Sequence, residues 1–466
     1  MKSRGQTHPI GGSSTDRGVW RGKSAQHTVF YLLLAFLLVC LAGGGSNRAD
    51  IASLLYLRPL SVVFLFAMLI VPAQWDFRCI RMPLILLGTL AVLMLVQLLP
   101  LPPSLWTSLP GRSPFTDAGI ALGGQPWRPI TLTPDLTLSS LLALLVPLTV
   151  LVGFAGIRPD QRTALVPLTI GAAVFSAVLG IIQFAGGQGA ANLYERALDV
   201  PNGLFANRNH HAAFLASALI LVSTWLRLPA HARWQRRRYW VGGLIAFLLL
   251  VVVIATGSRS GTLLAFLALV YTAATVLRTS SKALSPRKTL LLRAAFAIAA
   301  LLLIGFMLLA GRAVSLDRLF GFDPAGEQRI RAFPTLSAML RDFLPVGSGF
   351  GSFDPVFRMY EPDELLHPGY FNHAHNDWLE LALTGGVPAL LLLAVFIVWA
   401  GWRLYSSFRM PASSPALRAR GGGLVLLVLA AASVSDYPLR TPILAALLAL
   451  ACAWLSWEGG ERPVRS

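Results

Sequence analysis

Residues 386–402 read GVPALLLLAVFIVWAGW and contain no charged side chain. An apolar run of about 17–25 residues is long enough to cross the hydrocarbon core of a bilayer as a helix. Because the run is continuously apolar and does not alternate, it favours a helix over a strand of a membrane barrel. A helix also satisfies its own backbone hydrogen bonds in lipid. The stretch therefore predicts a membrane-spanning helix.

The same pattern recurs along the whole chain. Of its 466 residues, 55% are hydrophobic and 13% are charged, whereas soluble domains carry about 25% charged residues. Twelve apolar runs are candidates for membrane spans: 28–45, 51–72, 82–101, 136–156, 164–185, 210–228, 240–257, 260–277, 292–311, 386–402, 422–435 and 441–457. We therefore predict an all-α integral membrane protein with about 12 transmembrane helices.

The charges between the runs predict the orientation. With the N-terminus inside, the inner segments and their flanks hold 25 of the 39 Lys and Arg, including all four lysines, and 5 of the 21 acids. The outer segments hold 14 Arg, no Lys and 16 acids. This excess of inner cations is the positive-inside pattern. The basic run HARWQRRR at 231–238 is accordingly interpreted as a topology signal, and we expect no nucleic-acid partner.

The organisation that follows has five parts. They are an inner N-terminal tail at 1–27, nine helices with short loops at 28–311, a long outer loop at 312–385, three helices at 386–457 and an inner tail at 458–466. The loop between the ninth and tenth helices is too long for a simple connector. It contains Ile330, Phe333, Leu336 and Leu340 at helical spacing, which predicts an amphipathic helix on the membrane surface.

Two further features of the apolar segments bear on the class of membrane protein. A basic N-terminus before an apolar run is typical of a signal peptide, but because further runs follow, we interpret 28–45 as an uncleaved first helix. Ion-coupled carriers place acids at mid-depth in their helices, and the twelve runs contain none. This argues against a transporter without excluding one.

Three polar constellations share the predicted outer side. The first is NGLFANRNHHAAFLA at 202–216, which contains Arg208, and the second is GSRSG at 257–261, which contains Arg259. The third is HAHND at 373–377. Each has a plain structural alternative, because interfacial arginines commonly anchor to headgroups and histidines hydrate an interface.

The acids of the third constellation have their own interpretation. Asp377 and Glu380 have the spacing of a helix cap with its reciprocal partner, and we expect that role rather than catalysis. The H-x-H spacing of His373 and His375 could bind a metal, but no Cys or acid stands at a recognised ligand spacing. We therefore predict no metal site.

Together, two arginines and a histidine suit transfer from a diphosphate leaving group. Guanidinium groups bind phosphate oxygens bidentately and stay charged. An imidazole can take a proton from a hydroxyl nucleophile. The positive end of the helix that follows His375 would attract a phosphate.

These stretches resemble the O-antigen ligase superfamily, which also includes O-antigen polymerases and bacterial O-linked oligosaccharyltransferases. The resemblance is carried by VQLLPLPPSLW (96–106), GLFANRNHHAAFLA (203–216), TGSRSG (256–261), RDFLPVGSGFGSF (341–353) and NHAHNDWLELALTGGVPALLLL (372–393). The second of these is similar to a G-x-F-x-N-x-N-x-x-A element and the third to an S-R-S-G turn. Order and spacing on one predicted side make the resemblance specific.

The resemblance implies a glycosyltransferase of the bacterial inner membrane. The family moves a glycan from an undecaprenyl-pyrophosphate carrier to a glycan, lipid A core or protein acceptor on the periplasmic face, with inversion and without cofactor or metal. Carried over by motif, the catalytic residues are Arg208, Arg259 and His375. Substrate binding by the same arginines, by Asn376 and His373, and by a further arginine, Arg331 or its neighbour Arg329, is also implied. His373 is a second candidate base.

The sequence leaves three alternatives open. In the first, the protein polymerises repeat units instead of ligating finished chains, and nothing in the sequence decides between the two. In the second, it is a lipid-linked glycan flippase or another 12-helix transporter, although no repeat relates its two halves. In the third, it is an inactive scaffold of a polysaccharide assembly complex.

Overall fold

The computed structural model describes residues 14–47, 52–186, 193–194, 200–280, 328–366 and 371–456. The predicted ninth run, 292–311, and the predicted tail 458–466 lie outside these ranges. Within these ranges the regular secondary structure is helical apart from one pair of strands, in which β1 (Pro100–Leu101) runs antiparallel to β2 (Arg128–Pro129).

The predicted all-α membrane fold is confirmed in its main feature. Eight helical segments of the described chain are long and apolar enough to span a membrane. The helices of the bundle are α1 (Ser14–Gly43), α2 (Ser53–Ile70), α3 (Arg81–Gln97), α6 (Pro134–Ala143), α7 (Leu145–Ala155), α8 (Pro159–Ala185), α9 (Arg208–Arg227), α10 (Ala232–Ala255), α11 (Arg259–Ser280), α17 (Asp377–Arg409), α18 (Ser414–Ser435) and α19 (Pro442–Ser456). Every predicted run other than 292–311 falls on these helices, with 136–156 divided between α6 and α7. The count of twelve spans stays a prediction.

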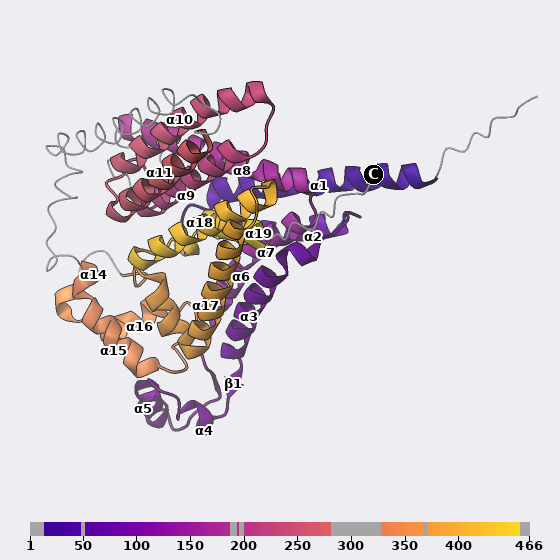
Figure 1. Ribbon diagram of the computed structural model, residues 1–466. Coiled ribbons are helices and arrows are strands. Elements are labelled where there is room, and N and C mark those ends of the chain that lie inside the picture. Colours follow the sequence, from indigo (N-terminus) through magenta and orange to yellow (C-terminus); the bar gives the residue numbers. More distant parts are fainter. Residues whose placement is uncertain are drawn as a thin grey trace, which may run out of the picture.

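The helix α9 lies at the centre of the bundle, packed against α8, α10, α11 and α18 (Figure 1). Its side chains are buried on all faces from His210 to Thr224. Because protein surrounds it, this helix does not need a lipid-compatible surface, and it carries Ser217 and Ser223 in its interior. That is the physical reason why α9 is absent from the eight apolar candidates.

The helix α17 is broken at Gly386, as its Gly-Gly-x-Pro sequence predicts. Gly386 has φ 62° and ψ −161°, and a Cβ there would lie 2.3 Å from the carbonyl oxygen of Pro345. The loop after Pro345 fills the break: Ser348 and Gly349 donate their N–H groups to the carbonyls of 383 and 384, both at 3.0 Å. The break therefore joins the outer loop firmly to the start of α17.

A small layer of short helices covers that end of α17 (Figure 1). It consists of α14 (Gln328–Arg331), α15 (Phe333–Phe343), α16 (Phe353–Tyr360) and η3 (Asp363–Leu365), and we refer to it as the lid. Leu336, Met339 and Phe343 of α15 are buried in its own apolar core. An amphipathic helix is present in this segment as α15, which is separated from α14 at Ala332 and carries Pro334 in its first turn. Its place on the membrane surface stays a prediction.

A buried arginine ties the other outer loop to the lid. Arg112 lies between α4 (Pro103–Trp106) and α5 (Ser113–Ala121), and it donates to the carbonyl of Ile130 at 2.6 Å and to that of Gly347 at 3.3 Å. Its guanidinium also faces the rings of Trp106 and Phe343. Burial without an acidic partner among these contacts lowers the pKa of Arg112 to about 10.

Arginines at the predicted inner side cap helix C-termini. Arg162 donates to the last carbonyls of α7, and Arg403 donates to the last carbonyls of α19. Arg238 donates to the carbonyl of Leu228 just after α9. Arg420 donates to the carbonyls of Ser407 and Met410 at the end of α17. The final carbonyls of a helix have no partner within the helix, and its C-terminus attracts cations. Residues that set the charge bias in the sequence therefore also join neighbouring helices.

Replacing Arg420 with methionine is expected to destabilise the bundle by about 2 kcal/mol, because two buried charge-assisted hydrogen bonds are lost. Arg420 is 7% exposed and its bonds to Ser407 and Met410 are 3.0 and 2.6 Å long. Thermal unfolding of the purified protein in detergent measures the effect. The matched control is Arg409→Met, whose exposed guanidinium contacts the Tyr405 hydroxyl. Equal melting temperatures for the two variants would contradict the capping role.

Candidate functional site

His375 occupies an unusual backbone conformation directly before α17. Among the described residues it is the one non-glycine with positive φ, at 49°, a region that histidine enters more readily than most residues. Its Nδ1 lies 3.2 Å from Oδ1 of Asp436, and its ring packs against Phe371 and Tyr437. None of the described residues hydrogen-bonds its Nε2. The ring is therefore oriented through one nitrogen while the other remains available.

His373 is held through both ring nitrogens. Its Nδ1 lies 3.0 Å from Oε1 of Glu380, and its Nε2 lies 2.7 Å from Nδ2 of Asn47. The two contacts fix a neutral tautomer in which Nδ1–H donates to the carboxylate and Nε2 accepts from the amide. His373 consequently has no ring nitrogen left to accept a proton from a substrate. His373 and His375 therefore contact different carboxylates, those of Glu380 and Asp436.

The predicted capping role of Asp377 and Glu380 is wrong. The cap of α17 is Asn376, whose Oδ1 accepts from the backbone N–H of Leu379 at 3.0 Å. Asp377 instead binds Nε of Arg440 at 3.1 Å, and Glu380 binds Nη2 of the same arginine at 3.1 Å. Glu380 also accepts from the backbone N–H of Ala374 at 2.9 Å. Because Arg440 is far away in sequence, local spacing could not reveal it.

Asp436 joins the first and third constellations. It follows α18 directly and is 2% exposed. Its Oδ2 accepts from the side-chain amides of Asn207 at 3.0 Å and Asn209 at 2.7 Å. Its Oδ1 faces His375 and accepts from the backbone N–H of Tyr437 at 3.0 Å. The two asparagines of the N-x-N element therefore position this carboxylate.

A second histidine also faces Asp436. Nε2 of His210 lies 3.7 Å from Oδ1, and the His210 ring is 1% exposed. Burial alone would raise the pKa of Asp436, but hydrogen bonds from His210 and His375 and the charge that these rings can carry outweigh burial. The pKa of Asp436 therefore lies well below its usual range, and the carboxylate stays ionised.

Asp436 and His210 were missed by the sequence reasoning. Asp436 stands alone in the sequence SVSDYP, at a turn between two apolar runs, and only its position between spans on the predicted outer side could have drawn attention to it. His210 lies next to the N-x-N element and is the first residue of the predicted span 210–228. Neither residue has a local spacing that predicts a site.

The two predicted arginines each begin a helix. Arg208 is the first residue of α9 after its cap Asn207, and Arg259 is the first residue of α11 after the tight turn at Gly257, which has φ 63°. Helix N-termini carry unpaired N–H groups and a positive partial charge, so an added arginine makes them suited to an anion. Arg259 is exposed and Arg208 is half-buried.

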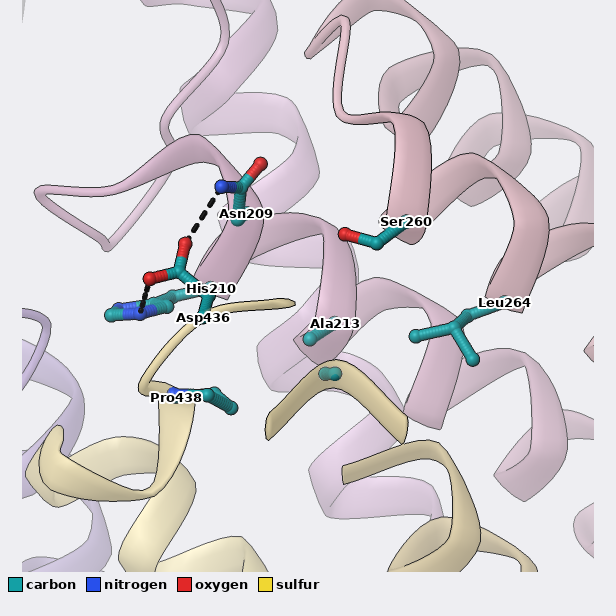
Figure 2. Close-up of a pocket in the computed structure, with 9 residues that line it drawn as sticks. Asn209, His210, Ala213, Ser260, Leu264, Asp436 and Pro438 are labelled. Atoms are coloured by element: carbon teal, nitrogen blue, oxygen red, sulfur yellow. Dashed lines mark hydrogen bonds and ion pairs between the residues drawn. The ribbon is translucent and has the colours of Figure 1, made fainter. Parts of the chain in front are cut away.

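The starts of these two helices converge on Asp436. A narrow crevice there is lined by Asn209 and His210 of α9, Ser260 of α11, and Asp436 (Figure 2). Asn209 and Ser260 directly follow the two arginines in sequence. The structure therefore brings the first and second constellations to the carboxylate that holds His375.

Arg331 lies on the lid. It ends α14, is exposed, and donates to the backbone carbonyl of Glu364 at 3.4 Å. Its neighbour Ile330 lines a hollow that His375 also lines. Arg331 is thus at the rim of the site, whereas the side chain of Arg329 lies outside the described residues.

The fold and this site define a multi-pass helical membrane protein with a polar centre at the ends of its helices. Residues 244–394 match the family model described as O-antigen ligase, so this part of the chain is similar to that family. Arg259 and His375 lie within the matched segment, and Arg208 and Asp436 lie outside it. The comparison with curated proteins returned no match.

Proposed function

We propose that the protein moves a glycan from an undecaprenyl-diphosphate carrier to an acceptor hydroxyl. The observation that carries the proposal is the pair of His375 and Asp436, with Nδ1 3.2 Å from a buried carboxylate and Nε2 available. In this arrangement the carboxylate orients the ring and stabilises the imidazolium that forms. The match of residues 244–394 to the O-antigen ligase family model supports a ligase-type or polymerase-type glycan transfer.

The proposed reaction is a direct displacement. Nε2 of His375 takes the proton of the acceptor hydroxyl while that oxygen bonds to the anomeric carbon of the donor. The bond between this carbon and the diphosphate oxygen breaks, and the diphosphate leaves with the electron pair. Attack opposite to the leaving group inverts the anomeric configuration. Arg208 and Arg259 neutralise the charge that grows on the diphosphate, and the proposed reaction uses no metal.

The remaining predicted residues have supporting roles in this proposal. Asn376 offers the Nδ2 group that its capping bond leaves over, and Arg331 offers a cation from the lid. His373 acts as a positioning residue through Glu380, because both its ring nitrogens are already bound. We assign catalysis to His375 and not to His373 on this difference.

The proposed setting is the bacterial inner membrane, with twelve spans and the site on the periplasmic side. The charge bias of the sequence supports this orientation. So do the four arginine caps, which all lie at helix ends opposite to the lid side.

The direct test uses purified protein in detergent with an undecaprenyl-diphosphate-linked oligosaccharide and a hydroxyl acceptor. We expect a product in which the glycan has left its carrier, formed in the presence of a metal chelator. Movement of the carrier-linked glycan across a liposome membrane without bond formation would instead support a flippase. Loss of a surface glycan, or its shortening to one repeat, in a gene deletion separates ligation from polymerisation.

Replacing Arg259 with lysine is expected to lower kcat/KM for the donor about a hundredfold, although the charge is retained. A lysine is a point charge and cannot bind two phosphate oxygens as a planar fork does. Initial rates at varied donor concentration measure the effect. Arg233→Lys, an exposed residue at the predicted inner side, is the control and should match the unmodified protein. Full activity of Arg259→Lys would remove the bidentate role.

A further inference from the structure

Two hollows adjoin the His375–Asp436 pair. A narrow crevice adjoins Asp436 and the starts of α9 and α11 (Figure 2). Arg208 and Arg259 are the first residues of these two helices. The second hollow, of about 250 Å³, adjoins His375 and the start of the lid.

The second hollow has an apolar wall. It is formed by Ile330, Phe333 and Leu336 of the lid, together with Leu379 and Val434. Phe333 is 60% exposed and Val434 is 58% exposed, so these side chains are not buried in a core of their own. No Lys, Arg, Asp or Glu is among the residues that line this hollow.

The lining also carries hydrogen-bonding groups, from His375, Asn376 and Ser435. Asn376 uses Oδ1 to cap α17, and within the part of the chain that the structure describes its Nδ2 has no hydrogen-bond partner. Nε2 of His375 likewise has no hydrogen-bond partner among the described residues. The hollow is thus amphiphilic, with two available polar groups beside the proposed base.

We infer that this hollow holds the acceptor, a neutral glycan, and that Phe333 determines which acceptor is used. The inference rests on the proposed function, in which the donor diphosphate binds beside Arg208 and Arg259. No charged side chain is among the described residues that line the hollow, so a diphosphate within it would be desolvated without a counter-charge in the lining. A pyranose ring matches this lining, since it has a face of C–H groups and a rim of hydroxyls.

The test measures separate KM values for donor and acceptor. The donor is an undecaprenyl-diphosphate-linked oligosaccharide, and the acceptor is the methyl glycoside of the same oligosaccharide, which has no diphosphate. Phe333→Ala is expected to raise the acceptor KM about tenfold, with the donor KM and the rate at saturation within twofold of the unmodified protein. The control is Met359→Ala, an exposed apolar residue of α16 that does not line the hollow, and it should leave both KM values unchanged.

Each other outcome overturns the inference. A rise in donor KM alone places the donor in the hollow, and unchanged KM values remove Phe333 from either site. Transfer to a serine-containing peptide but not to the glycoside assigns the hollow to a protein acceptor. Absence of transfer by the unmodified protein refutes the proposed function itself, which distinguishes the two failures.

Discussion

Replacing His375 with glutamine is expected to reduce the rate of glycan transfer at saturating substrates about a thousandfold. Glutamine has a similar size and can still hydrogen-bond Asp436, but it cannot accept a proton from the acceptor hydroxyl. The measurement is the initial rate of transfer by purified protein, with the amount of folded protein checked by gel filtration. The expected loss should appear in kcat rather than in KM.

The matched control is His373→Gln, which changes the other histidine of the same loop. Glutamine can replace the contacts to Glu380 and Asn47 in part, so we expect activity within about tenfold of the unmodified protein. A reversed result, in which the variant at 373 is inactive and the variant at 375 is active, would transfer the role of base to His373.

Replacing Asp436 with asparagine is expected to lower transfer by about a hundredfold to ten thousandfold. The carboxylate holds Nδ1–H of His375 and would stabilise the imidazolium, and an amide does neither well. An amide would also present N–H groups toward Asn207 and Asn209, which are themselves donors. Part of the effect is therefore expected as a lower melting temperature.

The control for this variant is Asp377→Asn, because that carboxylate contacts Arg440 and Ser433 and not His375. It should reduce stability while retaining more activity than Asp436→Asn. Equal kcat values for the two variants, after correction for folded protein, would show that Asp436 contributes to the fold and not to the orientation of His375.

The low pKa of Asp436 also predicts how this effect depends on pH. Its pKa in the folded protein lies well below the value of about 3.9 that an unfolded aspartate has. The ionised carboxylate therefore stabilises the fold fully above about pH 4, and this stabilisation is lost as the pH falls through the folded value. The difference in melting temperature between unmodified protein and Asp436→Asn should be constant near neutral pH and narrow in acid.

The sequence predicted the helices and motifs well because their signals are local. A membrane span is recognised by a continuous apolar run, since lipid excludes charge along the whole length of a helix. The break in α17 is likewise a local feature, because backbone freedom at Gly386 and ring closure at Pro388 belong to single residues. Arg208, Arg259 and His375 could be proposed from the sequence because each stands in a short motif.

The functional pairings could not be predicted in this way. Nothing local connects Asp436 to Asn209 or Arg440 to Glu380, and the prediction that Asp377 caps its helix failed for this reason. Local spacing favoured a cap, but Arg440, a half-buried cation from a distant turn, offers both carboxylates a stronger partner than a backbone N–H group.

By itself the sequence determined the membrane class, the predicted orientation and the three polar constellations. Only the tertiary structure distinguishes His373 from His375 as the proposed base, because the distinction depends on which ring has a nitrogen without a hydrogen-bond partner among the described residues. The partners are Asn47 after α1, Glu380 in α17 and Asp436 directly after α18, and they come together only when the bundle packs. Apolar patterning acts along the chain, whereas hydrogen bonding between side chains acts at short range in space, and only folding brings such distant residues within that range.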